Sequence, residues 1–89
     1  AVPVPYDLGT AVWRLQELLG EWQERMAAAD LPLQPPHAWD EAGWVANRWA
    51  ELLPMPLDDR QRLMAMDNPL LRLELVVDRL DAISGSASR

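Results

Sequence analysis

Apolar residues recur at spacings of three and four along most of this chain, which is the spacing of one face of an α-helix. The first run predicts a helix over residues 8–29, with Asp7 or Thr10 as the cap of its first turn. The apolar face of this helix consists of Val12, Leu15, Leu19, Trp22 and Met26. We expect the helix to end near Asp30, because Pro32 follows and proline disrupts a helix that continues through it.

A second helix follows after an irregular connection. Residues 31–37 contain three prolines and predict a loop, and residues 39–53 predict the helix, with Asp40 as its N-cap. Its apolar face consists of Ala42, Val45, Trp49, Leu52 and Leu53. Pro54 and Pro56 then end this helix, because neither residue supplies a backbone N–H group.

The third and fourth helices begin with recognisable capping residues. Asp58, followed three residues later by Gln61, is a capping box that predicts a short helix over residues 58–66. The fourth helix has Asn68 as its N-cap and a proline at its first helical position, and it ends near Gly85. Its apolar face consists of Leu70, Leu73, Val76, Val77, Leu80 and Ile83.

These elements predict an all-α fold, a small bundle of about four helices with proline-marked connections, over residues 8–84. The alternation of valine and proline at the start favours an extended linker over residues 1–7. The last residues, 85–89, are small and polar apart from one arginine and predict a disordered tail.

Length and charge narrow the classes of partner. The chain has 89 residues, enough for one domain, and 49% of them are hydrophobic, which is sufficient for a core. The net charge of −6 repels phosphate backbones and anionic lipid surfaces, so we expect neither nucleic acid nor membrane as a partner. No apolar run approaches the roughly 20 residues of a membrane span. This composition is compatible with a cytoplasmic location.

Few residues offer catalytic chemistry. The chain has no cysteine, and all eight basic residues are arginine, which excludes thiolate zinc sites, cysteine nucleophiles and the Walker A loop. His37 is the only histidine, and the paired carboxylates Asp40-Glu41 and Asp58-Asp59 stand at helix starts, where the helix dipole favours negative charge. We therefore predict no catalytic residue, no metal site and no cofactor. An enzyme fragment would need a composite site with residues from elsewhere.

Four apolar residues lie away from the apolar faces and form the candidate interaction surface: Trp13, Trp44, Leu71 and Leu75. Trp13 lies beside the charged face of the first helix, and Trp44 precedes Arg48 by one turn, which places the guanidinium to stack on the ring. Leu71 and Leu75 form a second stripe on the fourth helix. Either neighbouring helices cover these side chains, or the side chains mark a surface for a partner or for a missing part of the protein.

The segment 45–80 combines a helix stop with an immediate restart. Its elements are Leu52-Leu53-Pro54, Asp58-Asp59, Arg60-Gln61-Arg62-Leu63-Met64, Asp67-Asn68-Pro69 and Leu71-Arg72-Leu73-Glu74-Leu75-Val76. This series resembles the helical C-terminal half of the Lon substrate-binding domain, the N-terminal (peptidase S16 lon-type) domain of Lon proteases that also occurs in stand-alone bacterial proteins. One departure is the arginine at position 60, where the family usually has lysine.

The resemblance implies a non-catalytic subdomain that takes part in polypeptide recognition. Its expected partners are an upstream β-rich, PUA-like half of the same protein and unfolded or misfolded polypeptides. The opening Val-Pro-Val-Pro is similar to the linker that leaves this β-rich half in the family. The alternative is a structural or self-associating helical module, a homo-oligomer without direct substrate contact.

Overall fold

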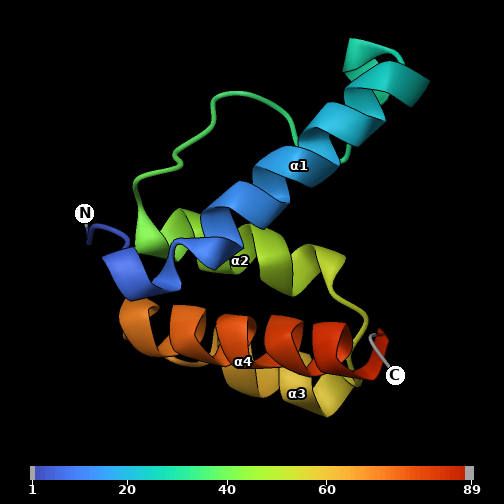
Figure 1. Cartoon of the computed structure of the whole chain (residues 1–89). Helices are drawn as coiled ribbons and strands as arrows, with labels where there is room; N and C mark the ends of the chain where they lie inside the picture. Colours follow the sequence, from blue (N-terminus) through green and yellow to red (C-terminus); the bar gives the residue numbers. More distant parts are fainter. Residues whose placement is uncertain (1, 88–89) are drawn as a thin grey trace.

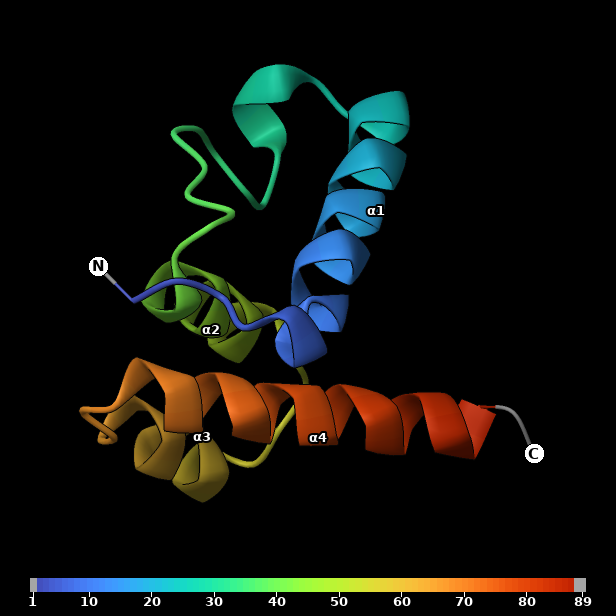
Figure 2. The ribbon, with the colours of Figure 1, turned by 60° about the vertical axis from the view of Figure 1, so that its left-hand side comes forward.

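Four α-helices form the architecture of residues 2–87, which the computed structural model describes together with the side chains of residues 2–83. The helices are α1 (Thr10–Arg25), α2 (Ala42–Leu52), α3 (Leu57–Met64) and α4 (Pro69–Ala87), with short 3₁₀ turns η1 (Tyr6–Leu8) and η2 (Ala28–Asp30). α4 packs against α2 and α1 on one side, and α3 lies along its other side (Figures 1 and 2). The predicted all-α bundle with proline-marked connections is confirmed.

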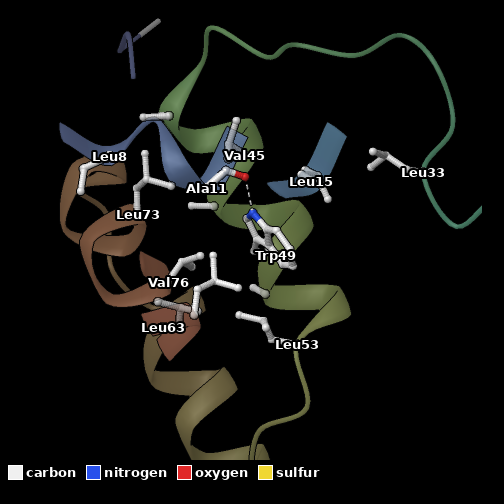
Figure 3. Packing of buried hydrophobic residues seen from close by; sticks show 14 of the residues in the cluster. Leu8, Ala11, Leu15, Leu33, Val45, Trp49, Leu53, Leu63, Leu73 and Val76 are labelled. Carbon is white, nitrogen blue, oxygen red and sulfur yellow. Dashed lines mark hydrogen bonds between the residues drawn. The ribbon is translucent and has the colours of Figure 1, made fainter. Parts of the chain in front are cut away.

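The hydrophobic core lies where α1, α2 and α4 meet. Leu15, Val45 and Leu73 are completely buried at the centres of the predicted apolar faces. Trp49 joins two helices, because its indole Nε1–H donates a hydrogen bond of 2.7 Å to the carbonyl oxygen of Ala11 (Figure 3). Small residues that the predicted faces mostly omit complete the contact and allow close approach of the helices: Ala11, Ala42, Ala46 and Ala50.

The first helix is shorter than predicted. α1 ends at Arg25, and Met26 is extended with φ −140° and ψ 159°, so the predicted end near Asp30 is wrong. The far end of α1 projects away from the other three helices (Figure 1), and residues 26–30 are exposed. A helix in water depends on packing of its apolar face for most of its stability. The alanines at 27–29 have high helix propensity but no surface to pack on.

Three predicted N-caps are wrong, and backbone groups of the preceding segments explain why. The N-cap of α1 is Gly9, because η1 leads directly into the helix, and neither Asp7 nor Thr10 forms a cap hydrogen bond. α2 has Glu41 as its N-cap in place of Asp40, and the N–H of its first residue bonds to a backbone carbonyl of the opening segment. The start of α2 is therefore held by a tertiary contact that the sequence does not reveal, whereas α1 continues directly from the local turn η1.

The predicted capping box at Asp58 does not form either. α3 begins at Leu57 with Pro56 as its N-cap, and no side chain bonds to its first turn. The N–H of Arg60 donates to the carbonyl oxygen of Pro56 at 3.1 Å, which starts the helix one residue earlier than predicted. Asp58 and Asp59 lie in the first turn, where the helix dipole favours their charge. α3 also ends at Met64, before the predicted end at residue 66.

The predicted cap of α4 is confirmed. The side-chain Oδ1 of Asn68 accepts a hydrogen bond of 2.9 Å from the N–H of Leu70, and Pro69 occupies the first helical position. Proline suits this position because its fixed φ is helical and its missing N–H would have no partner there. The prediction succeeded here because this cap is local and requires no distant segment.

The two residues predicted as caps, Asn68 and Asp58, give a direct stability comparison. We expect Asn68→Ala to lower the free energy of unfolding by about 0.5–2 kcal/mol, because a cap hydrogen bond is lost. Asn68→Asp, which keeps an acceptor, should stay close to the wild type. Asp58→Ala should cost only the few tenths of a kcal/mol that the helix dipole contributes at an exposed site. Urea unfolding followed by circular dichroism measures the order, and a larger loss at Asp58 than at Asn68 would contradict this assignment.

The opening segment is extended as predicted, and it is also part of the domain. The carbonyl oxygen of Val2 accepts a hydrogen bond of 2.8 Å from the N–H of Ala42, and the N–H of Val4 donates to the carbonyl oxygen of Asp40 at 3.3 Å. The side chains of Val2 and Val4 pack on the core. Residues 2–5 therefore hold the start of α2, which the prediction of a linker did not include.

The connection between α1 and α2 is irregular, as predicted, but one of its residues belongs to the core. Leu33 is only 1% exposed and lies on the same side of the cluster as Leu15 (Figure 3). Gln34 holds the loop by donating hydrogen bonds to the carbonyl oxygens of Ala28 and Leu31, at 3.0 and 2.8 Å. Burial of Leu33 and the hydrogen bonds of Gln34 therefore hold this loop in place.

The end of the chain differs from the predicted tail over 85–89. α4 continues to Ala87, two residues past the predicted end at Gly85. Ser88 and Arg89 lie outside the described residues, as does Ala1, the first residue of the predicted linker. Among the helices in the described part of the chain, none has the length and apolar character needed to cross a membrane.

Candidate functional site

Trp44 is covered by other parts of the domain. Its ring lies 5.2 Å, centroid to centroid, from Trp39 in an edge-on arrangement and 6.0 Å from His37, which itself stacks on Trp39 at 5.0 Å. The guanidinium of Arg48 lies over the Trp44 ring at 5.9 Å, which confirms the predicted stacking. Residues that precede α2 thus account for an apolar side chain on this face of the helix.

Trp13 remains 47% exposed, at the wall of a surface hollow of about 750 Å³. The opening segment contributes Pro3 and Pro5 to this hollow, and Tyr6 and Trp39 lie along it. Tyr6 is fully exposed, and the guanidinium of Arg14 lies 5.7 Å from the centre of the Trp13 ring. The hollow therefore presents aromatic and proline side chains to the surface.

Leu71 and Leu75 lie one turn apart on α4 and are 50% and 43% exposed. Leu75 forms part of a groove of about 370 Å³ between α3 and α4. Met55, Leu63 and Met66 supply the apolar wall on the α3 side. We call this feature the α3–α4 groove.

An ion pair bridges the α3–α4 groove. Arg79 Nη2 on α4 and Asp59 Oδ2 on α3 are 3.0 Å apart. Arg62 and Asp78 are further charged residues that line the groove. An apolar channel with charged edges is suited to bind an amphipathic segment.

The four predicted surface residues do not form one surface. Leu71 and Leu75 share one stripe of α4, and Trp13 and Trp44 are linked through Trp39, which lines the hollow and contacts the Trp44 ring. The hollow and the α3–α4 groove have no lining residue in common. The domain therefore has two separate apolar regions. Trp44 lines neither of them.

Sequence reasoning missed the α3 side of the groove and the exposure of Tyr6. Met55 and Met66 are half-buried and line the groove, although neither falls on a predicted apolar face. The only signal in the sequence was the pair of off-face leucines on the neighbouring helix. Recognising the groove required knowing that α3 lies beside α4.

His37, Asp58 and Asp59 lie in surroundings that indicate roles in the fold. His37 is flanked by aromatic rings, and its Nε2 lies 3.5 Å from the carbonyl oxygen of Leu33. Asp59 pairs with Arg79, and Asp58 is exposed in the first turn of α3. Among the residues that the structure describes, no three histidine or carboxylate side chains gather where a metal ion would bind. The hollow and the α3–α4 groove therefore offer mainly apolar side chains for contact.

The fold and its two apolar regions define a small helical domain with large hydrophobic side chains left at its surface. No protein-family model matches the sequence, and no curated protein is similar enough to count as a relative. The resemblance of residues 45–80 to Lon-type domains therefore remains a hypothesis based on their motifs.

Proposed function

We propose that this chain is a non-catalytic protein-interaction module that binds polypeptides, and that it is the helical half of a cytoplasmic protein of the Lon substrate-binding type. The supporting observation is that Leu71 and Leu75 are about half exposed, although the core is filled without them. Exposed apolar residues that adjoin a groove are typical of protein-binding surfaces.

The number of exposed hydrophobic residues supports a binding role. Large hydrophobic side chains exposed among residues 2–83 are Tyr6, Trp13, Met26, Leu57, Met64, Leu71, Leu75 and Ile83. Single exposed apolar residues are common on protein surfaces and need no explanation. Leu71 and Leu75 differ because they are adjacent on one helix and Leu75 continues into the α3–α4 groove. Burial of such a pair favours binding by about 25 cal/mol for each Å² removed from water, and the entropy cost of association is subtracted from this gain.

The hollow beside Trp13 suits a different partner. The extended residues Val2 and Pro3 lead into the domain along this hollow, with Tyr6 at its edge. In a longer protein of the Lon type, an upstream β-rich half would connect at this segment. We assign the Trp13 hollow to contact with that half and the α3–α4 groove to polypeptide binding.

Binding to an unfolded polypeptide tests the proposal. The probe is a fluorescein-labelled globular protein that has been reduced and carboxymethylated, so that it stays unfolded, and the signal is fluorescence anisotropy. We expect saturable binding by the wild type and about tenfold weaker binding by the double variant Leu71→Gln/Leu75→Gln, because the contact area of two leucines is lost. Leu57→Gln is the matched control, since Leu57 is 68% exposed but does not line the groove. Absence of saturable binding, or equal loss in the control, would contradict the proposal.

A self-associating structural module is the second candidate. The adjacent leucines on α4 favour it, because two copies would bury both pairs across a two-fold axis. The net charge of −6 on each copy opposes it. Sedimentation velocity at rising concentration distinguishes the candidates: we expect a monomer throughout, and a dimer lost in Leu71→Gln/Leu75→Gln would favour self-association.

A further inference from the structure

The α4 side of the α3–α4 groove has an apolar stripe with a regular spacing. Leu71, Leu75 and Ala82 are separated by four and seven residues, so they lie along one line of the helix. α3 lies beside the first half of α4 (Figure 2). Leu75 and Ala82 both line the groove. Leu71 and Leu75 are about half exposed and Ala82 is exposed, so the stripe is open to solvent.

Three of the four arginines of α3 and α4 bond to partners within the domain, and the fourth, Arg62, is exposed and lines the groove on the α3 side. Arg60 Nη2 donates a hydrogen bond of 3.1 Å to the carbonyl oxygen of Leu53, the C-cap residue that follows α2. Arg72 Nη1 donates to Asn47 Oδ1 on α2. Arg79 pairs with Asp59 of α3. These three positive charges are engaged in contacts within the domain, and of them Arg79 lines the groove while paired with Asp59.

Carboxylates of the same hairpin point outward. Those that are exposed and form no ion pair within residues 2–83 are Asp58, Asp67, Glu74, Asp78 and Asp81. Glu74, Asp78 and Asp81 are spaced by four and three residues, so they form one edge of α4. At 100° per residue this edge lies next to the stripe of Leu71 and Leu75. We call these three residues the acidic edge.

We propose that the α3–α4 groove binds a basic amphipathic helix of a partner polypeptide. Leucine-like side chains at helical spacing would contact the stripe and enter the groove beside Leu75, and Lys or Arg side chains would face the acidic edge. This inference rests on the proposed function and specifies the chemistry of the polypeptide. A second copy of this chain is a poorer occupant, because it would bring the same acidic edge and a net charge of −6.

Three synthetic peptides about four turns long test the chemistry of the occupant. The first has leucine at helical spacing and lysine elsewhere, the second has glutamate in place of every lysine, and the third has the composition of the first in an order that is not amphipathic. We expect the leucine/lysine peptide to bind saturably at low salt in a fluorescence anisotropy titration. Both other peptides should bind at least tenfold more weakly. Equal binding of the glutamate peptide or of the scrambled peptide would overturn the proposal.

Two triple variants with equal charge changes locate the site. Glu74→Gln/Asp78→Asn/Asp81→Asn removes the acidic edge, and we expect about tenfold weaker binding of the leucine/lysine peptide with a smaller salt dependence. The control replaces three exposed carboxylates of α1 by amides: Glu17→Gln, Glu21→Gln and Glu24→Gln. Circular dichroism verifies that both variants are folded. An equal loss in the control would show that only the net charge matters, which overturns the proposal.

Failure of this inference can be told apart from failure of the proposed function. If the carboxymethylated protein binds and loses affinity in Leu71→Gln/Leu75→Gln, while the acidic-edge variant binds the leucine/lysine peptide like the wild type, the groove binds polypeptides without a preference for basic helices. If neither probe binds, the proposed function is wrong as well. Binding of the peptide that is unaffected by Leu71→Gln/Leu75→Gln would place the site elsewhere and would also overturn the inference.

Discussion

Replacement of Trp49 by alanine should lower the free energy of unfolding by about 3–5 kcal/mol, which is the range for loss of a buried tryptophan or phenylalanine side chain. Trp49 is 4% exposed, and its indole N–H donates the hydrogen bond to Ala11 that joins α2 to α1. A domain of this size has a total stability of roughly 4–13 kcal/mol, so the variant loses a large part of it. Urea unfolding followed by circular dichroism at 222 nm measures the loss.

Two companion variants separate the contributions at this site. Trp49→Phe keeps most of the apolar volume and removes the indole N–H, and we expect a smaller loss, because one hydrogen bond contributes about 0.5–1.5 kcal/mol. Trp13→Ala removes the same type of side chain from an exposed position and should cost less than about 1 kcal/mol. A Trp49→Ala protein within 1 kcal/mol of the wild type would show that this contact is not central to the core.

The second large effect is expected in a loop. Leu33→Ala should reduce the free energy of unfolding by about 2–5 kcal/mol, because Leu33 is buried to the same degree as the core leucines of the helices. An irregular segment with three prolines would ordinarily tolerate such a change. Thermal unfolding and urea unfolding of the variant both measure the effect.

The neighbouring Gln34 is the control for this loop. Gln34→Ala removes two side-chain hydrogen bonds to exposed carbonyl groups, which water replaces, so we expect a loss below about 1 kcal/mol. If Leu33→Ala were as mild as Gln34→Ala, the loop would not belong to the core.

The centres of the helices could be predicted from the sequence, and their ends mostly could not. Leu15, Val45 and Leu73 repeat with the helical period, and a buried face imposes that period directly. The end at Arg25 depends on the lack of a packing surface for the residues that follow, and the start of α2 depends on a backbone hydrogen bond to the opening segment. Asn68 was predictable because its hydrogen bond reaches only two residues along the chain.

For the surface residues too, the helical period predicts one part and tertiary contacts decide the other. The helical period identified Trp13, Leu71 and Leu75 as lying off the apolar faces, and all three are about half exposed. It identified Trp44 in the same way, but Trp39 and His37 cover that ring. A single residue in a loop has no period, so nothing in the sequence distinguishes a covering residue from a solvent-exposed one.

The groove and the contacts of its charged residues could be recognised only once the arrangement of the helices was known. Arg60, Arg72 and Arg79 are indistinguishable in the sequence from exposed arginines, and only their contacts reveal that they bond within the domain. The sequence gives the net charge of the hairpin, whereas the structure shows which charges a partner would meet. The spacing of the acidic edge is visible in the sequence, whereas the contacts that engage the arginines are a result of the tertiary fold.

Nuclear magnetic resonance of the ¹⁵N-labelled chain, titrated with the reduced and carboxymethylated protein, tests the central claim most directly. That claim is that polypeptides bind at the α3–α4 groove while the core stays intact. We predict saturable shifts of the backbone amide signals of Leu63, Leu71 and Leu75, with the signals of exposed α1 residues such as Glu17 unchanged. Shifts spread evenly over the whole chain, or no shifts at saturating polypeptide, would contradict the claim.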